Sequence, residues 1–255
     1  MPERKQPDSV NPAARNKRLP IFERILDDIK KRKRTDKAFV VGINGIDGAG
    51  KTKFAESFEE FLIARNYKTQ MISIDDFHNP QAYRYAGDNQ ADNYYHKSFN
   101  IDLVVEKLLL PLRPKNAFTI KLTQLDWHTD KYEIEKIYSF SQKTIVILEG
   151  VFLFRKELSP YIDYKIFLEI PFEESKRRAL SRDATISKSE LRKYDEKYLP
   201  AQRKYLAEFP PSETADMIID NTNWESPYIT SARPKLVNKP TDKIKHFIPK
   251  YPVAP

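Results

Sequence analysis

Gly45-Ile46-Asp47-Gly48-Ala49-Gly50-Lys51-Thr52 is the stretch that decides the fold, because it fits the pattern G-x-x-x-x-G-K-[ST] of a phosphate-binding loop. Residues 38–44 before it are apolar and β-branched and predict a buried strand. Residues 53–62 after it carry apolar side chains at helical spacing and predict a helix. This strand–loop–helix context supports the motif over its alternative, a chance match in an ordinary turn.

The residue types in this loop suit the binding of a nucleoside triphosphate. Glycine most easily adopts the backbone angles that point successive amides at an anion, and four of the six glycines lie in residues 42–50. Lys51 is expected to reach the β- and γ-phosphates, and the Thr52 hydroxyl to bind Mg²⁺. The predicted ATP-binding residues of the loop are Gly45, Ile46, Asp47, Gly48, Ala49, Gly50, Lys51 and Thr52.

Composition narrows the class of protein. The 255 residues include no cysteine, which excludes disulfides and thiolate metal sites, and no apolar run approaches the roughly 18 residues of a membrane span. No signal peptide is recognisable, and we expect a cytoplasmic protein. The net charge of +8 belongs to the ends: residues 1–37 carry +6, residues 223–255 carry +4, and the remainder −2. A basic nucleic-acid-binding body is therefore not expected, although the run 30–34 could touch an anionic partner.

The phosphate-binding loop and the order of the hydrophobic segments together predict an α/β fold of the P-loop NTPase type, with three layers and a mainly parallel five-stranded sheet. The strands are expected at 38–44, 70–74, 144–148, 164–168 and 215–219, and helices at 21–33, 53–62, 101–112, from 171 onward and 194–209. Alternating segments at 118–122 and 132–137 predict a small hairpin excursion. We expect a disordered extension over 1–19, a domain over 20–222 that contains the phosphate-binding loop, and a Pro-rich basic tail over 223–255.

Acidic residues follow two of the predicted strands, where a parallel sheet places its chemistry. Asp75 and Asp76 follow the strand at 70–74, and one of them could accept a proton from a hydroxyl and hold Mg²⁺ through water. Glu149 ends the strand at 144–148 like the acid of a Walker-B strand, near the metal. The alternatives are an Asp pair that caps a turn and a strand-end acid that faces solvent.

Three other regions contain candidate functional residues. Arg178 and Arg182 share one face of the helix that starts near 171, as a lid that neutralises a transferring phosphoryl group requires, although their charge also suits the helix dipole. Residues 79–100, rich in Tyr, Asn and Asp, are interpreted as a recognition loop, or as aromatic packing on a surface loop. His128, between carboxylates and Trp127, is either a substrate contact or a structural residue.

With these pieces in order, the chain resembles the uridine kinase-like branch of P-loop kinases, which includes phosphoribulokinase, pantothenate kinase and nicotinamide riboside kinase. The resemblance runs from about residue 21 to 223. It rests on residues 41–52, on Ser73-Ile74-Asp75-Asp76-Phe77, on Tyr94-Tyr95-His96-Lys97-Ser98-Phe99, on Leu148-Glu149-Gly150-Val151-Phe152-Leu153, and on Arg177-Arg178 through Arg182-Asp183.

The resemblance implies ATP as phosphoryl donor and Mg²⁺ as cofactor. By position it implies Asp75 as general base, Thr52, Asp75 and Glu149 at the metal, and Arg178 and Arg182 on a lid of about residues 174–205. Together with Lys51, Asp75 and these two arginines form the catalytic set, while Asp220 falls near the adenine side.

The sequence departs from the family pattern in the acceptor pocket. Lys97 stands where the family's Tyr-Tyr-x-Asp-Ser-Phe pattern has aspartate, and Leu125 stands where eukaryotic uridine kinases place a tyrosine. Candidates for acceptor binding in the segment of about residues 79–140 are Asp88, Asp92, Tyr95 and His128.

The sequence therefore predicts an ATP-dependent kinase that phosphorylates a hydroxyl of a small molecule, with the 5′-OH of a nucleoside such as uridine first. Pantothenate, glycerate, nicotinamide riboside and sugar phosphates are alternative acceptors. A nucleotide-binding regulator without acceptor turnover is an alternative of another class. Expected partners are ATP and the acceptor, without nucleic acid or membrane, and the oligomeric state stays open.

Overall fold

The computed structural model describes residues 12–33, 36–113, 117–182 and 192–233. Its centre is a six-stranded sheet in the order β2-β5-β1-β6-β7-β8, in which only the pairing of β7 with β8 is antiparallel. The strands are β1 (Phe39–Gly45), β2 (Thr69–Ser73), β5 (Ile145–Gly150), β6 (Tyr164–Glu169), β7 (Met217–Asp220) and β8 (Tyr228–Ala232). The α/β class and the parallel sheet are confirmed.

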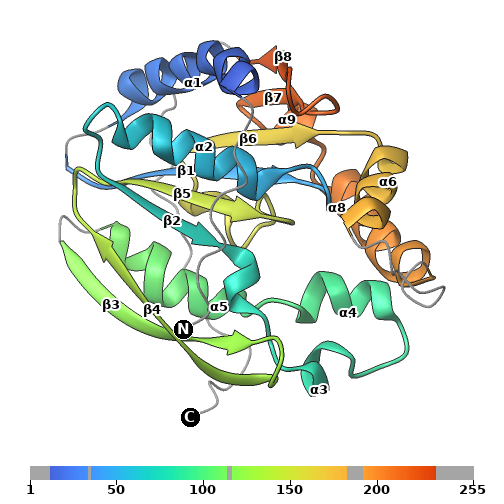
Figure 1. Ribbon diagram of the computed structural model, residues 1–255. Helices are drawn as coiled ribbons and strands as arrows, with labels where there is room; N and C mark the ends of the chain where they lie inside the picture. The colour runs from blue at the N-terminus through green and yellow to red at the C-terminus, as the bar shows by residue number, and fades with distance from the viewer. Residues whose placement is uncertain (1–11, 34–35, 114–116, 183–191, 234–255) are drawn as a thin grey trace.

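Side chains from opposite faces of this sheet enter two separate hydrophobic cores. In β1, Phe39, Val41 and Ile43 point to one core and Val40 to the other, as the period of two in a strand dictates. The first core also contains the apolar faces of α1 (Pro12–Arg32) and α2 (Lys51–Ile63), which lie together on one face of the sheet (Figure 1). The predicted three-layer arrangement follows from this division.

The opposite face is covered by short helices and by a hairpin (Figure 1). The apolar segment predicted as one helix over 101–112 consists of α5 (Ile101–Val104), a π-helical turn η2 (Val105–Leu109) and a 3₁₀ turn η3 (Leu110–Leu112). The hairpin is confirmed as β3 (Phe118–Asp126) and β4 (Lys131–Phe140), a two-stranded antiparallel sheet of its own.

The remaining elements lie at the ends of the strands: the two that directly precede β6 and β7 are at the amino ends, and the others are around the carboxyl ends. They are the 3₁₀ turn η1 (Ile74–Phe77), α3 (Gln81–Arg84), α4 (Gln90–Lys97), the 3₁₀ turn η4 (Ser159–Tyr161), α6 (Phe172–Arg182), the π-helical turn η5 (Tyr194–Tyr198), α8 (Leu199–Glu208) and α9 (Pro211–Thr214). Within the described ranges, no helix is long and apolar enough to cross a membrane.

Three expectations about elements need correction. The first helix begins at Pro12 and continues through Pro20, so disorder does not extend to residue 19, and residues 1–11 lie outside the described part. Residues 79–100 contain α3 and α4 and are not one loop. The tail includes the sixth strand, β8, which pairs with β7, while residues 234–255 lie outside the described part.

Candidate active site

The phosphate-binding loop lies at the carboxyl end of β1, in the middle of the sheet, and its last two residues, Lys51 and Thr52, form the start of α2. Gly48 and Gly50 have φ angles of 74° and 84°, which other residues adopt only with strain. A Cβ on Gly50 would also lie 2.9 Å from Nδ2 of Asn221. The loop therefore needs glycine at both positions, and the start of α2 presents its amide dipoles to the space above.

Neighbouring elements hold this loop through hydrogen bonds to its backbone carbonyls. Asn221 donates from Nδ2 to the Ala49 carbonyl at 2.7 Å, and Arg178 donates from Nη1 to the Gly48 carbonyl at 2.9 Å. The Ser175 hydroxyl donates to the Asp47 carbonyl at 2.5 Å. These three hydrogen bonds stabilise the loop backbone in the conformation seen here.

The Asp47 side chain adds a second attachment on the inner side of the loop. Its carboxylate accepts from the Tyr94 hydroxyl at 3.1 Å and from Nε2 of Gln202 at 2.5 Å, and its own amide donates to Oε1 of Gln202 at 2.9 Å. Burial raises the pKa of this carboxyl, while Lys51 and the two hydrogen bonds oppose that shift. Asp47 thus links the loop to α4 and α8.

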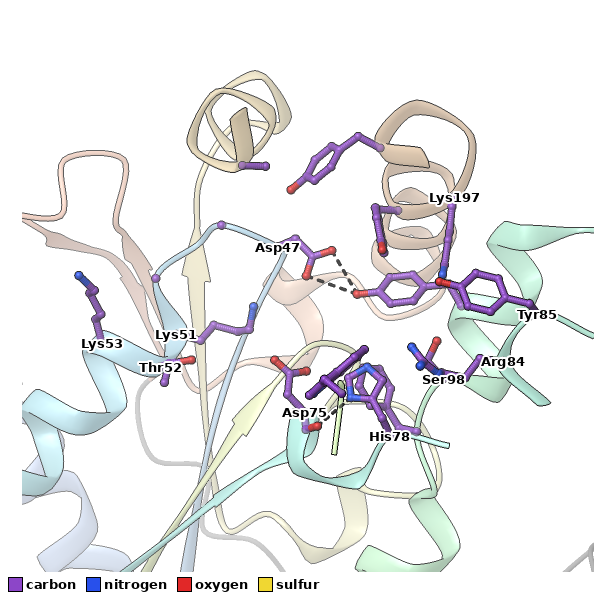
Figure 2. A pocket seen from close by; sticks show the side chains of 18 residues that line it. Asp47, Lys51, Thr52, Lys53, Asp75, His78, Arg84, Tyr85, Ser98 and Lys197 are labelled. Carbon is purple, nitrogen blue, oxygen red and sulfur yellow. Dashed lines mark hydrogen bonds between the residues drawn. The ribbon is translucent and has the colours of Figure 1, made fainter. Parts of the chain in front are cut away.

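A cavity of about 550 Å³ opens from the loop toward α3 and η5. Its lining includes Lys51, Thr52 and Asp75 at one end and Arg84, Tyr85 and Lys197 at the other, as Figure 2 shows. The first end combines the residues of the motif with a carboxylate from the end of β2.

Asp75 and Asp76 have different environments although they are adjacent. Asp76 forms an ion pair with Lys136 of β4 at 2.5 Å, whereas the Asp75 carboxylate lies in the cavity on the side of Lys51 (Figure 2). Burial raises the pKa of Asp75, the positive charge of Lys51 lowers it, and the negative charge of Asp76 raises it. Asp75 is the member of the pair that a substrate hydroxyl could reach.

Glu149 of β5 offers the position for a metal. Its Oε1 accepts from the Ser73 hydroxyl at 2.5 Å and from the Thr52 hydroxyl at 3.3 Å, while its buried Oε2 has no hydrogen-bond partner. Burial raises the pKa of Glu149. In the described part, no group of three or more acidic or histidine side chains is placed to hold a metal ion. A cation here would therefore rely on one carboxylate, one hydroxyl and phosphate oxygens, a set that suits Mg²⁺.

The second end of the cavity is built from aromatic rings and cations. The His78 ring lies 4.1 Å from the Trp127 ring and 4.5 Å from the Phe99 ring, and its Nδ1 is 2.7 Å from the Asp75 carbonyl. Burial lowers the pKa of His78 to about 4, so the ring is neutral near pH 7. With Nδ1 donating to that carbonyl, Nε2 is left as an acceptor.

Comparison with known proteins assigns the family. The model of the phosphoribulokinase/uridine kinase family matches residues 40–224. The chain belongs to this family. It is 26% identical over 185 residues to a uridine kinase of Proteus mirabilis, covering 71% of this chain and 85% of that protein. It is 28% identical over 217 residues to a uridine kinase of Borrelia duttonii, covering 80% and 98%.

The fold of the family is also found among solved structures. A structure from Bacillus stearothermophilus, described as a possible uridine kinase, superimposes with a TM-score of 0.64 at 24% identity and covers 78% of this chain and 98% of that one. The two chains therefore share one fold over nearly the whole length of that neighbour.

Within this family member, several predicted site residues gather at the cavity. Asp47, Gly48, Gly50, Lys51, Thr52 and Asp75 line it. Glu149 contacts Thr52 directly behind them. The prediction of these residues as one site rested on the motif and on the strand ends, and the topology brings them together.

The predicted acceptor-binding residues are not brought to the cavity. Asp88 is exposed, Asp92 forms an ion pair with Lys204 at 2.6 Å, and His128 is exposed in the hairpin turn. The Tyr95 hydroxyl donates to Glu208 at 3.3 Å, on a side of α4 away from the cavity. Burial raises the pKa of Tyr95 to about 12. None of the four lines the cavity, so this arrangement does not support an acceptor role for them.

Three predicted residues outside the phosphate-binding loop have other positions. Arg178 donates to carbonyls of the loop and of Asn221 and Thr222, which makes it a residue that positions the loop in this conformation. The Asp220 carboxylate accepts from the Thr222 amide and the Tyr228 hydroxyl beside this contact. Arg182 is the last residue of α6, and its side chain lies outside the described part.

Sequence reasoning missed two buried cations in the cavity, Arg84 and Lys197. Each lies in a polar stretch without a motif of its own: Arg84 in the segment interpreted as a loop, and Lys197 in a helix with many charges. The sequence carried no signal that would separate them from exposed lysines and arginines nearby.

Proposed function

We propose that this chain transfers the γ-phosphoryl group of ATP to a hydroxyl group of a small molecule. The nucleoside 5′-OH is the first acceptor class to consider, since the relatives named above are uridine kinases. The observation that carries the proposal is the presence of Asp75 and the loop residue Lys51 in one cavity. Pantothenate, glycerate, nicotinamide riboside and sugar phosphates are the other acceptors to assay.

Each of these residues has a task in the transfer. The acceptor oxygen forms a bond to the γ-phosphorus, the bond from that phosphorus to the bridging oxygen of ADP breaks, and the acceptor proton goes to the Asp75 carboxylate. The loop amides and Lys51 neutralise the charge of the phosphates. Thr52 and Glu149 would hold Mg²⁺, since the unpartnered Oε2 of Glu149 fits a cation or its water. When bound, Mg²⁺ would neutralise further negative charge on the phosphates.

The substitution Asp75→Asn tests the general base. It keeps the shape of the side chain but removes the proton acceptor, so kcat should fall by at least about 100-fold. Binding of a fluorescent ATP analogue should stay within a few-fold of wild type, because the loop is untouched. A coupled assay of ADP release over the acceptor panel, with single-turnover experiments, measures the change.

Asp76→Asn is the matched control, one residue away and with the same chemistry. It removes a half-exposed ion pair with Lys136, an interaction worth about 1 kcal/mol or less. Its kcat near pH 7 should stay close to wild type. Equal losses in both variants would contradict the assignment of Asp75, and ATP binding without turnover of any acceptor would favour a nucleotide-binding regulator.

A further inference from the structure

Two cations are buried at the end of the cavity that lies away from the phosphate-binding loop. The Arg84 side chain is 5% exposed and Lys197 is 4% exposed, and both line the cavity. Figure 2 shows them across the cavity from Lys51. Burial of a charged group is costly unless an opposite charge or hydrogen bonds compensate for it. Two such groups in one wall therefore need an explanation.

Aromatic rings stabilise Lys197 only in part. Its ammonium lies 4.3 Å from the ring centroid of Tyr85, 5.1 Å from that of Tyr198 and 5.6 Å from that of Tyr94. No carboxylate among the described residues lies within ion-pair distance of it. Burial lowers the pKa of Lys197, Tyr85 raises it, in part through a hydrogen bond, and the neighbouring Arg84 lowers it. The ammonium thus has rings and a phenol around it but no counter-charge.

Arg84 is compensated incompletely as well. Its guanidinium lies 4.7 Å from the Trp127 ring centroid, and its Nη2 is 3.5 Å from Oδ1 of Asp130. Asp130 also accepts two hydrogen bonds from the Gln81 amide, at 2.9 and 3.1 Å. The buried Nε of Arg84 has no hydrogen-bond partner. A donor of this strength, left without an acceptor next to a cavity, suits an anionic ligand.

The rings in this wall are already in contact with protein cations or with His78. Trp127 packs against both Arg84 and His78, and the tyrosines surround Lys197. Trp127 is 51% and Tyr85 40% exposed, so a neutral base could stack on their open faces, but it would leave both buried cations without a counter-charge from the ligand. A carboxylate or phosphate, in contrast, would accept hydrogen bonds from them as they stand.

We propose that Arg84 and Lys197 bind an anionic group of the acceptor, so that the substrate is a hydroxyl compound that also carries a carboxylate or a phosphate. This inference rests on the proposed kinase function and refines its acceptor, whether or not the scaffold is a nucleoside. The hydroxyl then lies toward Asp75 and the anion at the far wall. The loop and Lys51 serve the triphosphate at the opposite end.

Matched pairs of acceptors test the proposal. They are uridine with its 6-carboxylate orotidine, glycerol with D-glycerate, and ribulose with ribulose 5-phosphate. Binding is measured by calorimetry with ADP and Mg²⁺ present, and turnover by ADP release with ATP. At least one anionic member should bind about tenfold or more tightly than its neutral partner. Comparison of the carboxylate compounds with the phosphate compound shows which of the two anionic groups the site prefers.

Two variants then locate the anion. Arg84→Gln and Lys197→Met should each raise the Kd and KM of the anionic acceptor by about 10- to 100-fold, the size expected for a lost charge-assisted hydrogen bond. The KM for ATP should change little. Lys197→Met keeps an apolar stem of similar length and removes a buried charge, so it should fold even if Arg84→Gln does not. Lys121→Gln, on the exposed face of β3, is the control for general charge effects.

The outcomes separate this inference from the proposed function. Equal or tighter binding of every neutral member would overturn the inference, while turnover of uridine would still support a kinase. Binding of an anionic member that Arg84→Gln and Lys197→Met both weaken, without turnover of any acceptor in the panel, would sustain the anion site and count against the kinase function. A loss of kcat and ATP affinity in both variants, with unchanged acceptor KM, would assign the cations to the transferring phosphoryl group and overturn the inference.

Discussion

At the scale of single residues, adjacent positions with the same chemistry have separate tasks. The sequence Asp75-Asp76 predicts a carboxylate at the end of β2 but does not say which of the two faces the substrate. The ion-pair partner of Asp76, Lys136, lies in the hairpin about 60 residues further along the chain. Only the packing of β4 beside η1 makes this partner available, so no local pattern could have assigned the pair.

The pH dependence of the reaction provides a test at this scale. Burial and Asp76 raise the pKa of Asp75 above its ordinary value of 3.8, and a general base acts only when deprotonated. The rate should therefore fall as the pH decreases through this raised pKa. Asp76→Asn removes one negative charge that raises it, so the acidic limb of kcat/KM should move to lower pH. The profiles are measured from pH 4 to 8. If the acidic limb did not move in Asp76→Asn, the limb would have to be assigned to the titration of another group.

At the scale of elements, the segment between β2 and β3 shows what composition cannot predict. Its many Tyr, Asn and Asp residues are typical of loops, yet Asn89 caps α4 by accepting from the Asp92 amide at 3.1 Å. The helix then directs Tyr94 into the cavity and Tyr95 toward Glu208. If the segment were a loop, either tyrosine could face the substrate. The direction of α4 determines that Tyr94 does and Tyr95 does not.

The contact between α8 and the phosphate-binding loop supports a prediction about stability. Gln202, 1% exposed, bonds both the amide and the carboxylate of Asp47. Gln202→Ala should lower the free energy of unfolding by about 1–3 kcal/mol, because it leaves a buried carboxylate with fewer donors. Urea denaturation measures this loss, and calorimetry should also show weaker binding of an ATP analogue.

Arg203→Ala, on the exposed side of the same helix, is the control for that substitution. It removes only a contact 4.2 Å from the Phe172 ring centroid, worth about 0.5–1 kcal/mol at an exposed site. A similar loss of nucleotide affinity in both variants would mean that α8 acts through its overall packing. The specific link from Gln202 to Asp47 would then be unimportant.

At the scale of the whole molecule, the sequence predicted the sheet because each parallel strand is a short apolar run with a motif or an acid at its end. The edge strand β8 was missed because Tyr228–Ala232 is polar and half-exposed, as befits an antiparallel edge. The early start of α1 was missed for a related reason. Arg18 bonds Ser57 at 3.2 Å and the Trp224 carbonyl at 2.8 Å, contacts that only the folded chain supplies.

These contacts make α1 part of the main structure, and this has a measurable consequence. Phe22 is 3% exposed and packs its ring against Phe54, Phe58 and Phe61 of α2. Phe22→Ala should lower the free energy of unfolding by about 3–5 kcal/mol, since it removes a large buried side chain and leaves a cavity. Leu19→Ala, at a position 38% exposed, should cost about 1 kcal/mol or less. If α1 were only an appendage, both substitutions would leave urea unfolding of the sheet unchanged. A single transition shifted by Phe22→Ala, and seen equally by fluorescence and circular dichroism, would show that α1 and the sheet unfold together.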